Sequence, residues 1–516
     1  MKKQSLIKGS LILGIAGIFS RFLGLFFRWP LIMLIGDEGV GYYQMSYPLY
    51  MFFVAMASGV PIAISKMISE NNVNGNPKNN FVVVKEANIL MSILGMGTTV
   101  ILFIFAKPVV NFLDWDSKAY YSLIGISFAP CIISFLTVYR GFFQGYQNMT
   151  PSALSQILEQ AGRVIFGVGL TLILLPYGIE FSAGGAASGA AFGGIIACIY
   201  LYSKYRNIRK KENIVKVESN PKILNKILKI SIPISIGATV GSIMSLIDSI
   251  LVPQKLLDAG FTSQQSTILY SQLTGKASVI VNIPLTLSMA ICTSIIPIIA
   301  EVYILKNKNE IENKINLVLK LSAIISIPCL FGLFFLAEPI MKLIFPGHYE
   351  GAEILKYLSL SIPFIIITQT TTSILQGIGR YIVPVINLLI GCVVKVILTT
   401  VLVANRSINI YGAVIASIGA YVIVSALNLM AMKLKIGIKM NLYNNYIKPA
   451  YASSIMMIGV LLMYNYVYKK TFSNSISCLL SISIGVIIYS IGILVFKIFS
   501  IEEVKGKVNK RFRKHF

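Results

Sequence analysis

The sequence predicts an all-α polytopic membrane protein with 14 transmembrane helices, built as two parallel six-helix repeats plus two C-terminal helices. Three observations predict this fold. The composition is 55% hydrophobic and only 13% charged. Apolar stretches of about 20 residues recur along the 516-residue chain, each long enough to cross a hydrocarbon core of about 30 Å. Short pieces of sequence also recur in the same order at a nearly constant spacing. A transmembrane barrel would instead show short segments of alternating polarity.

The charge pattern sets the expected orientation of the spans. Basic residues are concentrated in alternate connections and in both tails, which the positive-inside rule places in the cytoplasm. The other connections are acidic or poor in cations, with the connection that holds Lys469 and Lys470 as the one exception. Asp37 and Glu38 are expected to mark one of them, an external turn between the first two spans. Both termini are therefore expected to be cytoplasmic. The spans are predicted near 6–35, 42–69, 81–105, 119–144, 152–176, 182–203, 226–253, 270–300, 315–337, 353–376, 382–403, 410–432, 446–466 and 475–499.

The internal repeat divides the chain. FAKPVVNFL at 105–113 resembles LAEPIMKLI at 336–344, and the pairs Gln144/Gln376, Gly145/Gly377 and Arg163/Lys395 are each separated by 232 residues. Parallel repeats of this kind are related by an axis along the membrane normal and hold the substrate at their interface. The predicted parts are an N-terminal six-helix lobe (1–205), a basic cytoplasmic linker (206–225), a C-terminal six-helix lobe (226–435), two additional transmembrane helices (446–499) and a basic cytoplasmic tail (500–516).

The first predicted span carries two arginines within the segment SRFLGLFFRWP at 20–30. Arg21 and Arg28 are seven residues apart, so they share one helix face at a separation of about 10 Å. An arginine at bilayer depth costs at least about 2.5 kcal/mol, and such residues are usually functional. In one interpretation Arg28 reaches the outer interface while Arg21 pairs with a buried acid. In the other, both face a cationic cavity that receives an anion.

Other charges at apparent membrane depth are mostly basic, with two acids among them. Glu159 and Arg163 are four residues apart and are expected to neutralise each other. Asp248 is either a counter-ion to one of the arginines or a site of cation coupling. The remaining charges are Lys66 and Arg140, which lie near cytoplasmic helix ends and either snorkel or face the cavity, and Lys276 and Lys395.

The balance of these charges is positive. A cationic cavity suits a phosphate or pyrophosphate, which arginine binds in a bidentate manner. The candidate substrate-binding residues are Arg21, Arg28, Lys276, Arg163 and Lys66, and the candidate ion-coupling or counter-ion residues are Asp248 and Glu159.

Several function classes have no support in the sequence. The six cysteines are scattered singly through apolar segments, and the two histidines form no metal-binding spacing. No nucleotide-binding or hydrolase motif is present, so we expect no cofactor, no metal and no enzymatic activity. The net charge of +25 follows the membrane pattern, which argues against a nucleic-acid partner.

Three stretches carry a resemblance to a known family: KGSLILGIAGIFSRFLGLFFRWPLIMLIGDEGVGYYQMSYPLY (8–50), SGVPIAISKMISE (58–70) and RGFFQGYQNMTPSALSQILEQAGRV (140–164). They resemble the MOP superfamily (the multidrug/oligosaccharidyl-lipid/polysaccharide exporters). Within it they resemble the stage V sporulation protein B and MurJ-type branch of lipid II flippases. The resemblance implies translocation of an undecaprenyl-pyrophosphate-linked cell-wall precursor from the inner to the outer leaflet of a bacterial plasma membrane.

The same resemblance assigns roles and partners. In the MurJ type two first-helix arginines line the cavity, and Arg21 and Arg28 match them. A basic residue is expected in the eighth helix, where Lys276 is the nearest candidate. The implied partners are the lipid-linked anionic glycan precursor and membrane lipids, with cell-wall polymerases as further candidates. Alternatives are a drug/cation antiporter of the same superfamily, a flippase for another lipid-linked polysaccharide unit, and a non-transport cell-wall enzyme or scaffold.

Overall fold

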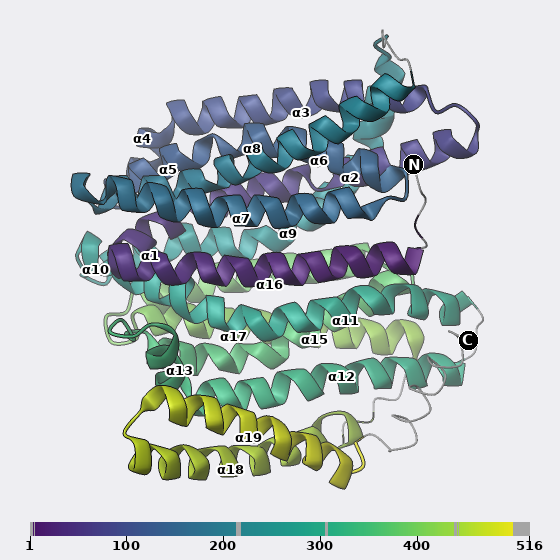
Figure 1. Cartoon of the computed structure of the whole chain (residues 1–516). Helices are drawn as coiled ribbons and strands as arrows, with labels where there is room; N and C mark the ends of the chain where they lie inside the picture. Colours follow the sequence, from purple (N-terminus) through teal and green to yellow (C-terminus); the bar gives the residue numbers. More distant parts are fainter. Residues whose placement is uncertain are drawn as a thin grey trace. The chain divides into compact units, whose positions relative to one another are not determined.

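The computed structural model describes residue 4 and residues 6–212, 218–304, 308–437, 441 and 443–498, and this part of the chain is helical (Figure 1). The basic tail, part of the linker (213–217) and the Arg21 side chain lie outside the described residues. The helices of the first half are α1 (Leu6–Ala57), α2 (Gly59–Val73), α3 (Asn79–Ile104), α4 (Ala106–Phe112), α5 (Ala119–Ser127), α6 (Ala129–Gly145), α7 (Met149–Leu174) and α8 (Ile179–Lys211). Those that follow are α9 (Pro221–Asp258), α10 (Ser263–Ser271), α11 (Ser278–Ile304), α12 (Lys308–Phe335), α13 (Ala337–Ile344), α14 (Ala352–Leu358), α15 (Ile362–Gly377), α16 (Ile382–Val403), α17 (Ile410–Ile436), α18 (Lys448–Thr471) and α19 (Asn474–Val495).

The chain forms two compact units, which we describe separately. The first comprises Met1–Gly275 and Lys395–Ala413, and the second comprises Lys276–Val394 and Val414–Phe516. The chain passes from one unit to the other between Gly275 and Lys276, inside the π-helical segment Gln272–Ala277, and again between Val394 and Lys395 and between Ala413 and Val414. The division into lobes at 205 and 226 stays a prediction.

The number of spans agrees with the sequence once one bend is considered. Thirteen stretches of the described chain are long and apolar enough to cross a membrane. The first, Ile12–Val73, has 62 residues, more than twice the roughly 20 residues that one pass through a 30 Å core requires. It bends at Gly36 (φ 62°, ψ −170°), a conformation that glycine alone adopts readily. This stretch therefore supplies two of the fourteen predicted passes.

The predicted turn between the first two spans was wrong. The helix resumes directly after Gly36, so Asp37 and Glu38 lie in the second segment of α1 and not in a loop. A single glycine with positive φ replaces the expected connection, because it bends the chain while the residues on both sides of it remain helical.

Each unit repeats the same local irregularity. The long helix α3 ends at Phe105 (φ −92°, ψ 10°) and is followed by the short helix α4. In the second unit α12 ends at Leu336 (φ −104°, ψ 20°) and is followed by the short helix α13. These junctions fall in the two stretches that resemble each other in the sequence.

Helices α7 and α8 pack closely in the first unit (Figure 1). The sequence of α8 contains the run SAGGAASGAAFGG, and small residues let two membrane helices approach closely. A Cβ added at Gly189 would lie 2.7 Å from the Cα of Gly167, and one at Gly193 would collide with the Glu159 carbonyl. This contact fixes the segment of α7 that carries Glu159 and Arg163.

The second unit has an apolar core and a peripheral hairpin. Buried side chains of α11, α12 and α15, such as Ile299, Leu319 and Ile374, form that core. Helices α18 and α19 pack against each other, and the Tyr489 hydroxyl donates to the Ile324 carbonyl of α12 at 3.1 Å. These are the two helices that the repeat does not include.

Candidate functional site

Of the two first-helix arginines, Arg28 is the one whose side chain lies within the described part of the chain. Its side chain is half-buried on α1, and its Nη1 donates to the Thr274 carbonyl over 3.4 Å, a long hydrogen bond. Within the described chain no carboxylate lies within ion-pair distance of it. Thr274 belongs to the π-helical segment Gln272–Ala277, and π-helical segments are frequent at functional sites. Arg28 therefore keeps most of its donors available.

The face of α1 that carries the two arginines has empty space beside its glycines. Helical spacing puts Gly14, Gly17 and Gly24 on the side of α1 that carries Arg21 and Arg28. A Cβ added at any of the three glycines would meet nothing within 4 Å. These glycines are not explained by close helix packing, and they leave space beside the arginines.

Arg163 and Glu159 form the ion pair that their spacing predicts, and Arg140 joins it. Glu159 Oε2 accepts from Arg140 Nη2 at 2.8 Å, and its Oε1 lies 3.7 Å from Arg163 Nη2. Arg140 Nε also donates to the Ser155 hydroxyl at 2.9 Å. Arg140 thus turns toward the protein and does not snorkel. Two cations share one carboxylate, so this cluster carries one net positive charge.

Two tyrosines complete the surroundings of Arg163. Its guanidinium lies 5.9 Å from the Tyr47 ring centre and 5.8 Å from that of Tyr50, in cation–π geometry. Long hydrogen bonds of 3.5 and 3.4 Å reach the two hydroxyls. Arg163 is only 6% exposed, and its Nε has no partner among the described residues. The cluster is held in place on several sides, which fits a structural role at least as well as a substrate contact.

Asp248 pairs with a lysine and not with an arginine. Its Oδ2 lies 2.6 Å from Lys395 Nζ, which also donates to the Met244 carbonyl at 3.0 Å. Lys395 is 3% exposed, so the pair is shielded from solvent and is close to neutral. Of the two roles left open for Asp248, the geometry matches that of a counter-ion.

Lys276 is fully buried in the second unit. Its Nζ donates to the His348 carbonyl at 2.7 Å and lies 3.6 Å from Glu350 Oε2. The Phe345 ring centre is 6.0 Å away. In this conformation the ammonium group holds the loop between α13 and α14. Lys66, by contrast, is exposed on α2, as expected for a snorkelling residue.

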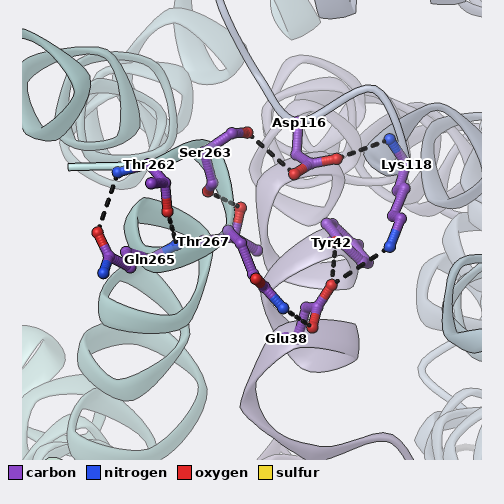
Figure 2. Close-up of polar contacts among 9 residues, drawn as sticks. Glu38, Tyr42, Asp116, Lys118, Thr262, Ser263, Gln265 and Thr267 are labelled. Atoms are coloured by element: carbon purple, nitrogen blue, oxygen red, sulfur yellow. Dashed lines mark hydrogen bonds and ion pairs between the residues drawn. The ribbon is translucent and has the colours of Figure 1, made fainter.

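The sequence did not point to a polar network at the predicted outer end of the first unit (Figure 2). Glu38 accepts from Tyr42 at 2.6 Å and from Gln264 at 2.7 Å, while Asp116 accepts from Ser263 at 2.9 Å. These contacts join α1 and the loop before α5 to the start of α10. Only the clustering of acids in predicted outer connections hinted at them.

Over the described residues, histidine, cysteine and acidic side chains form no group of three or more that suits a metal ion.

Comparisons with known proteins place these features in a family. The family model described as "Polysaccharide biosynthesis protein" matches residues 6–303, and the MatE model matches residues 273–401. Stage V sporulation protein B of Bacillus subtilis (strain 168) is 29% identical over 453 residues, which cover 86% of this chain and 87% of that protein. Lipid II flippase MurJ of the same organism is 27% identical, with 81% of each chain covered.

Solved structures show the same fold. A structure titled "Lipid II flippase MurJ, inward closed conformation" matches with a TM-score of 0.73 at 20% identity, over 94% of this chain and 98% of that one. An inward-facing multidrug resistance transporter of the MATE family matches with a TM-score of 0.67 at 16% identity, over 84% and 98% of the two chains. The chain therefore belongs to the polysaccharide biosynthesis protein family of the MOP superfamily, in the branch that includes stage V sporulation protein B and the MurJ flippases.

Proposed function

We propose that this protein is a flippase that moves an undecaprenyl-pyrophosphate-linked cell-wall precursor, similar to lipid II, from the inner to the outer leaflet. The head group enters from the cytoplasm, binds to cations in a central cavity and leaves on the outer side after a conformational change. The prenyl tail stays in the lipid. The relative named as a lipid II flippase, similar over four fifths of both chains, supports this substrate class.

The observation that carries the proposal is the state of Arg28. A guanidinium group at bilayer depth with one long hydrogen bond and no carboxylate partner in the described chain is costly to keep without a ligand. A pyrophosphate supplies the paired, planar acceptors that arginine binds best. Arg21 lies two helical turns away on the same face and is proposed as the second ligand.

The surrounding charges favour an anion. Arg140, Arg163 and Glu159 sum to one positive charge, and Lys395 and Asp248 cancel. Arg28 adds a further positive charge. Arg163, Lys276 and Lys66 remain proposed substrate contacts, reached only if the contacts described above rearrange.

No nucleotide-binding motif accompanies this site, so the membrane potential is the proposed driving force. Moving one charge through 100 mV is worth about 2.3 kcal/mol, and an inside-negative potential favours the exit of an anion. Consumption of the precursor on the outer side would add to this driving force.

The direct test is complementation. Cells depleted of their own flippases would receive the wild-type gene or an empty vector, and outward exposure of the precursor would be measured with an enzyme that cleaves it only from outside. We expect exposure to recover with the wild-type gene alone. Failure to recover, with the protein correctly inserted, contradicts the proposal.

A second candidate is a drug/cation antiporter of the same superfamily, favoured by the MatE match over residues 273–401. Such a transporter needs acids that bind the coupling cation. Asp248 and Glu159 are both committed to basic side chains, which makes this the weaker candidate. Drug resistance conferred on a sensitive strain, and lost in Asp248→Asn, would favour it.

A further inference from the structure

We propose that Thr368, Gln369 and Thr372 of α15 form an uncharged hydrogen-bonding site for the sugar part of the head group. The inference rests on the proposed function, because it names the part of that substrate which the second compact unit recognises. All three residues belong to this unit.

The site lies in a run of polar residues inside a membrane-spanning helix. The sequence of α15 is IPFIIITQTTTSILQG, in which TQTTTS occupies 368–373 and no residue is charged. Hydroxyl and amide groups at membrane depth need hydrogen-bond partners, so such a run serves either contacts between helices or a ligand. The hydrogen bonds of the individual residues separate these two roles.

Two residues of the run are committed to contacts between helices. Thr370 Oγ1 lies 2.6 Å from the Ser322 hydroxyl of α12. Thr371 donates to the Ile367 carbonyl at 2.7 Å and accepts from Asn428 Nδ2 of α17 at 3.1 Å. Both threonines are buried. Packing of α15 against its neighbours therefore explains these two hydroxyl groups.

Packing does not explain Thr368 and Gln369. Thr368 is 7% exposed, and neither its Oγ1 nor Gln369 Oε1 has a hydrogen-bond partner among the described residues. Thr370 and Thr371 each donate to the carbonyl four residues earlier, whereas Thr368 does not. A buried polar atom without a partner is destabilising, and a ligand that bonds to it removes this cost. The two oxygens are open positions for a ligand.

Thr372 supplies a donor beside them. Asn428 is fully buried, and its Oδ1 accepts from Asn387 Nδ2 at 2.8 Å, which fixes the orientation of the amide. Its Nδ2 then donates to the Thr372 hydroxyl at 3.3 Å. Because this hydroxyl accepts from Asn428, it can donate its own proton to a ligand. An uncharged set of donors and acceptors matches sugar hydroxyl groups, which both donate and accept.

The face of α15 that carries these groups is not a lipid-facing surface. Helical spacing puts Gln369, Thr372 and Gln376 on one face, and all three are half-buried. Lipid-facing side chains are apolar, as on α16, where Ile386 and Ile390 are 50% and 42% exposed. A partly covered face with amide and hydroxyl groups is suited to water or a polar ligand.

The internal repeat shows how the two units differ at this face. Thr137, Arg140 and Gln144 of α6 precede the three residues of this α15 face by 232 positions each and are also half-buried. The middle position is Arg140, paired with Glu159, in the first unit and Thr372 in the second. The same face is thus charged in one unit and neutral in the other. A neutral face suits the hydroxyl and acetamido groups of a sugar better than a phosphate.

The test compares two lipids that differ only in the sugar. Purified protein in nanodiscs would be titrated with undecaprenyl pyrophosphate and with the same lipid carrying one N-acetylhexosamine. We expect Thr368→Val and Gln369→Met to bind the sugar-bearing lipid about fivefold more weakly, roughly the effect of one hydrogen bond. Binding of undecaprenyl pyrophosphate should not change. Arg28→Ala should weaken binding of both lipids by the same factor.

Two controls separate recognition from folding. Thr368→Ser keeps the hydroxyl group and should bind like wild type, as should Thr286→Val on α11, where the hydroxyl donates to the Asn282 carbonyl of its own helix. The thermal unfolding midpoint of Thr368→Val should not fall, because the substitution removes an unpartnered polar atom.

The outcomes distinguish the sugar site from the proposed function. Equal losses for the two lipids in Thr368→Val and Gln369→Met, or a lower midpoint with unchanged binding, overturn the sugar site alone. Wild-type protein that binds neither lipid contradicts the proposed function, and the sugar site with it.

Discussion

The Glu159 carboxylate lies between two guanidinium groups, 2.8 Å from Arg140 Nη2 on one oxygen and 3.7 Å from Arg163 Nη2 on the other. Its exposed side-chain fraction is 11%, so both cations depend on it for charge compensation inside the membrane region. This arrangement makes α6 and α7 a single electrostatic unit and gives Glu159 a structural task that the sequence only partly indicates.

Glu159→Gln should therefore destabilise the protein strongly. Removing one partner of a buried ion pair leaves uncompensated charge and costs about 3 kcal/mol or more. The measurement is the midpoint of thermal unfolding of the purified protein in one detergent. Glu338→Gln, which removes the partner of Lys342 in an exposed pair on α13, is the matched control and should cost less than about 1 kcal/mol. Equal midpoints for the two variants would contradict the structural role of Glu159.

Asp248 and Lys395 allow a test of charge coupling. Either Asp248→Asn or Lys395→Gln alone leaves one buried charge and should lower both stability and transport. The double variant removes both charges, and we expect it to recover at least half of the wild-type precursor exposure. Transport that stays absent in the stable double variant would show that Asp248 does more than balance Lys395, as the antiporter model requires.

The α7–α8 contact predicts a position-dependent effect of alanine. Gly193→Ala pushes a methyl group into the Glu159 carbonyl and should cost about 1–3 kcal/mol. Gly169→Ala, on the same pair of helices but with nothing within 4 Å, should be neutral or stabilising by about 0.5–1 kcal/mol. The thermal unfolding midpoints of the two variants check this. A neutral Gly193→Ala would mean that the helices are not in direct backbone contact.

Hydrogen exchange can show whether Lys276 holds the loop between α13 and α14 in place. Lys276→Met removes the ammonium group that holds the His348 carbonyl, so amide exchange in residues 345–351 should increase at least tenfold. Lys342→Met, an exposed lysine on α13, serves as the control and should leave that loop unchanged. Unchanged exchange in Lys276→Met together with lost transport would instead make Lys276 a substrate ligand alone.

The sequence was sufficient to predict the helices. It was not sufficient to predict which side chains of different helices pair with one another. Apolar length identified the spans because each span obeys a local requirement of the bilayer. The spacing of Glu159 and Arg163 predicted their pairing because four residues form one helical turn. That Arg140 joins them from α6, and that Lys395 pairs with Asp248, depends on tertiary packing, which a single sequence does not contain.

Two local misreadings have the same origin. Residues 36–41 look like a turn because acids and glycines gather there, yet one glycine conformation at Gly36 is enough to bend the helix. The sequence therefore predicts an external loop around Glu38. In the structure it lies in a helix and accepts hydrogen bonds from Tyr42 and Gln264. The one signal for this role was the clustering of acids in the predicted outer connections.

The central claim is that Arg28 holds the anionic head group, and a charge series at this residue tests it most directly. Precursor exposure would be measured in flippase-depleted cells that express wild type, Arg28→Lys, Arg28→Ala or, as an exposed control on α13, Lys342→Ala at equal levels, with Arg21→Ala in parallel. The account predicts partial activity for Arg28→Lys, at least a tenfold loss for Arg28→Ala and Arg21→Ala, and near-normal activity for the exposed control. Full activity in Arg28→Ala would contradict the claim and reduce this arginine to a structural anchor.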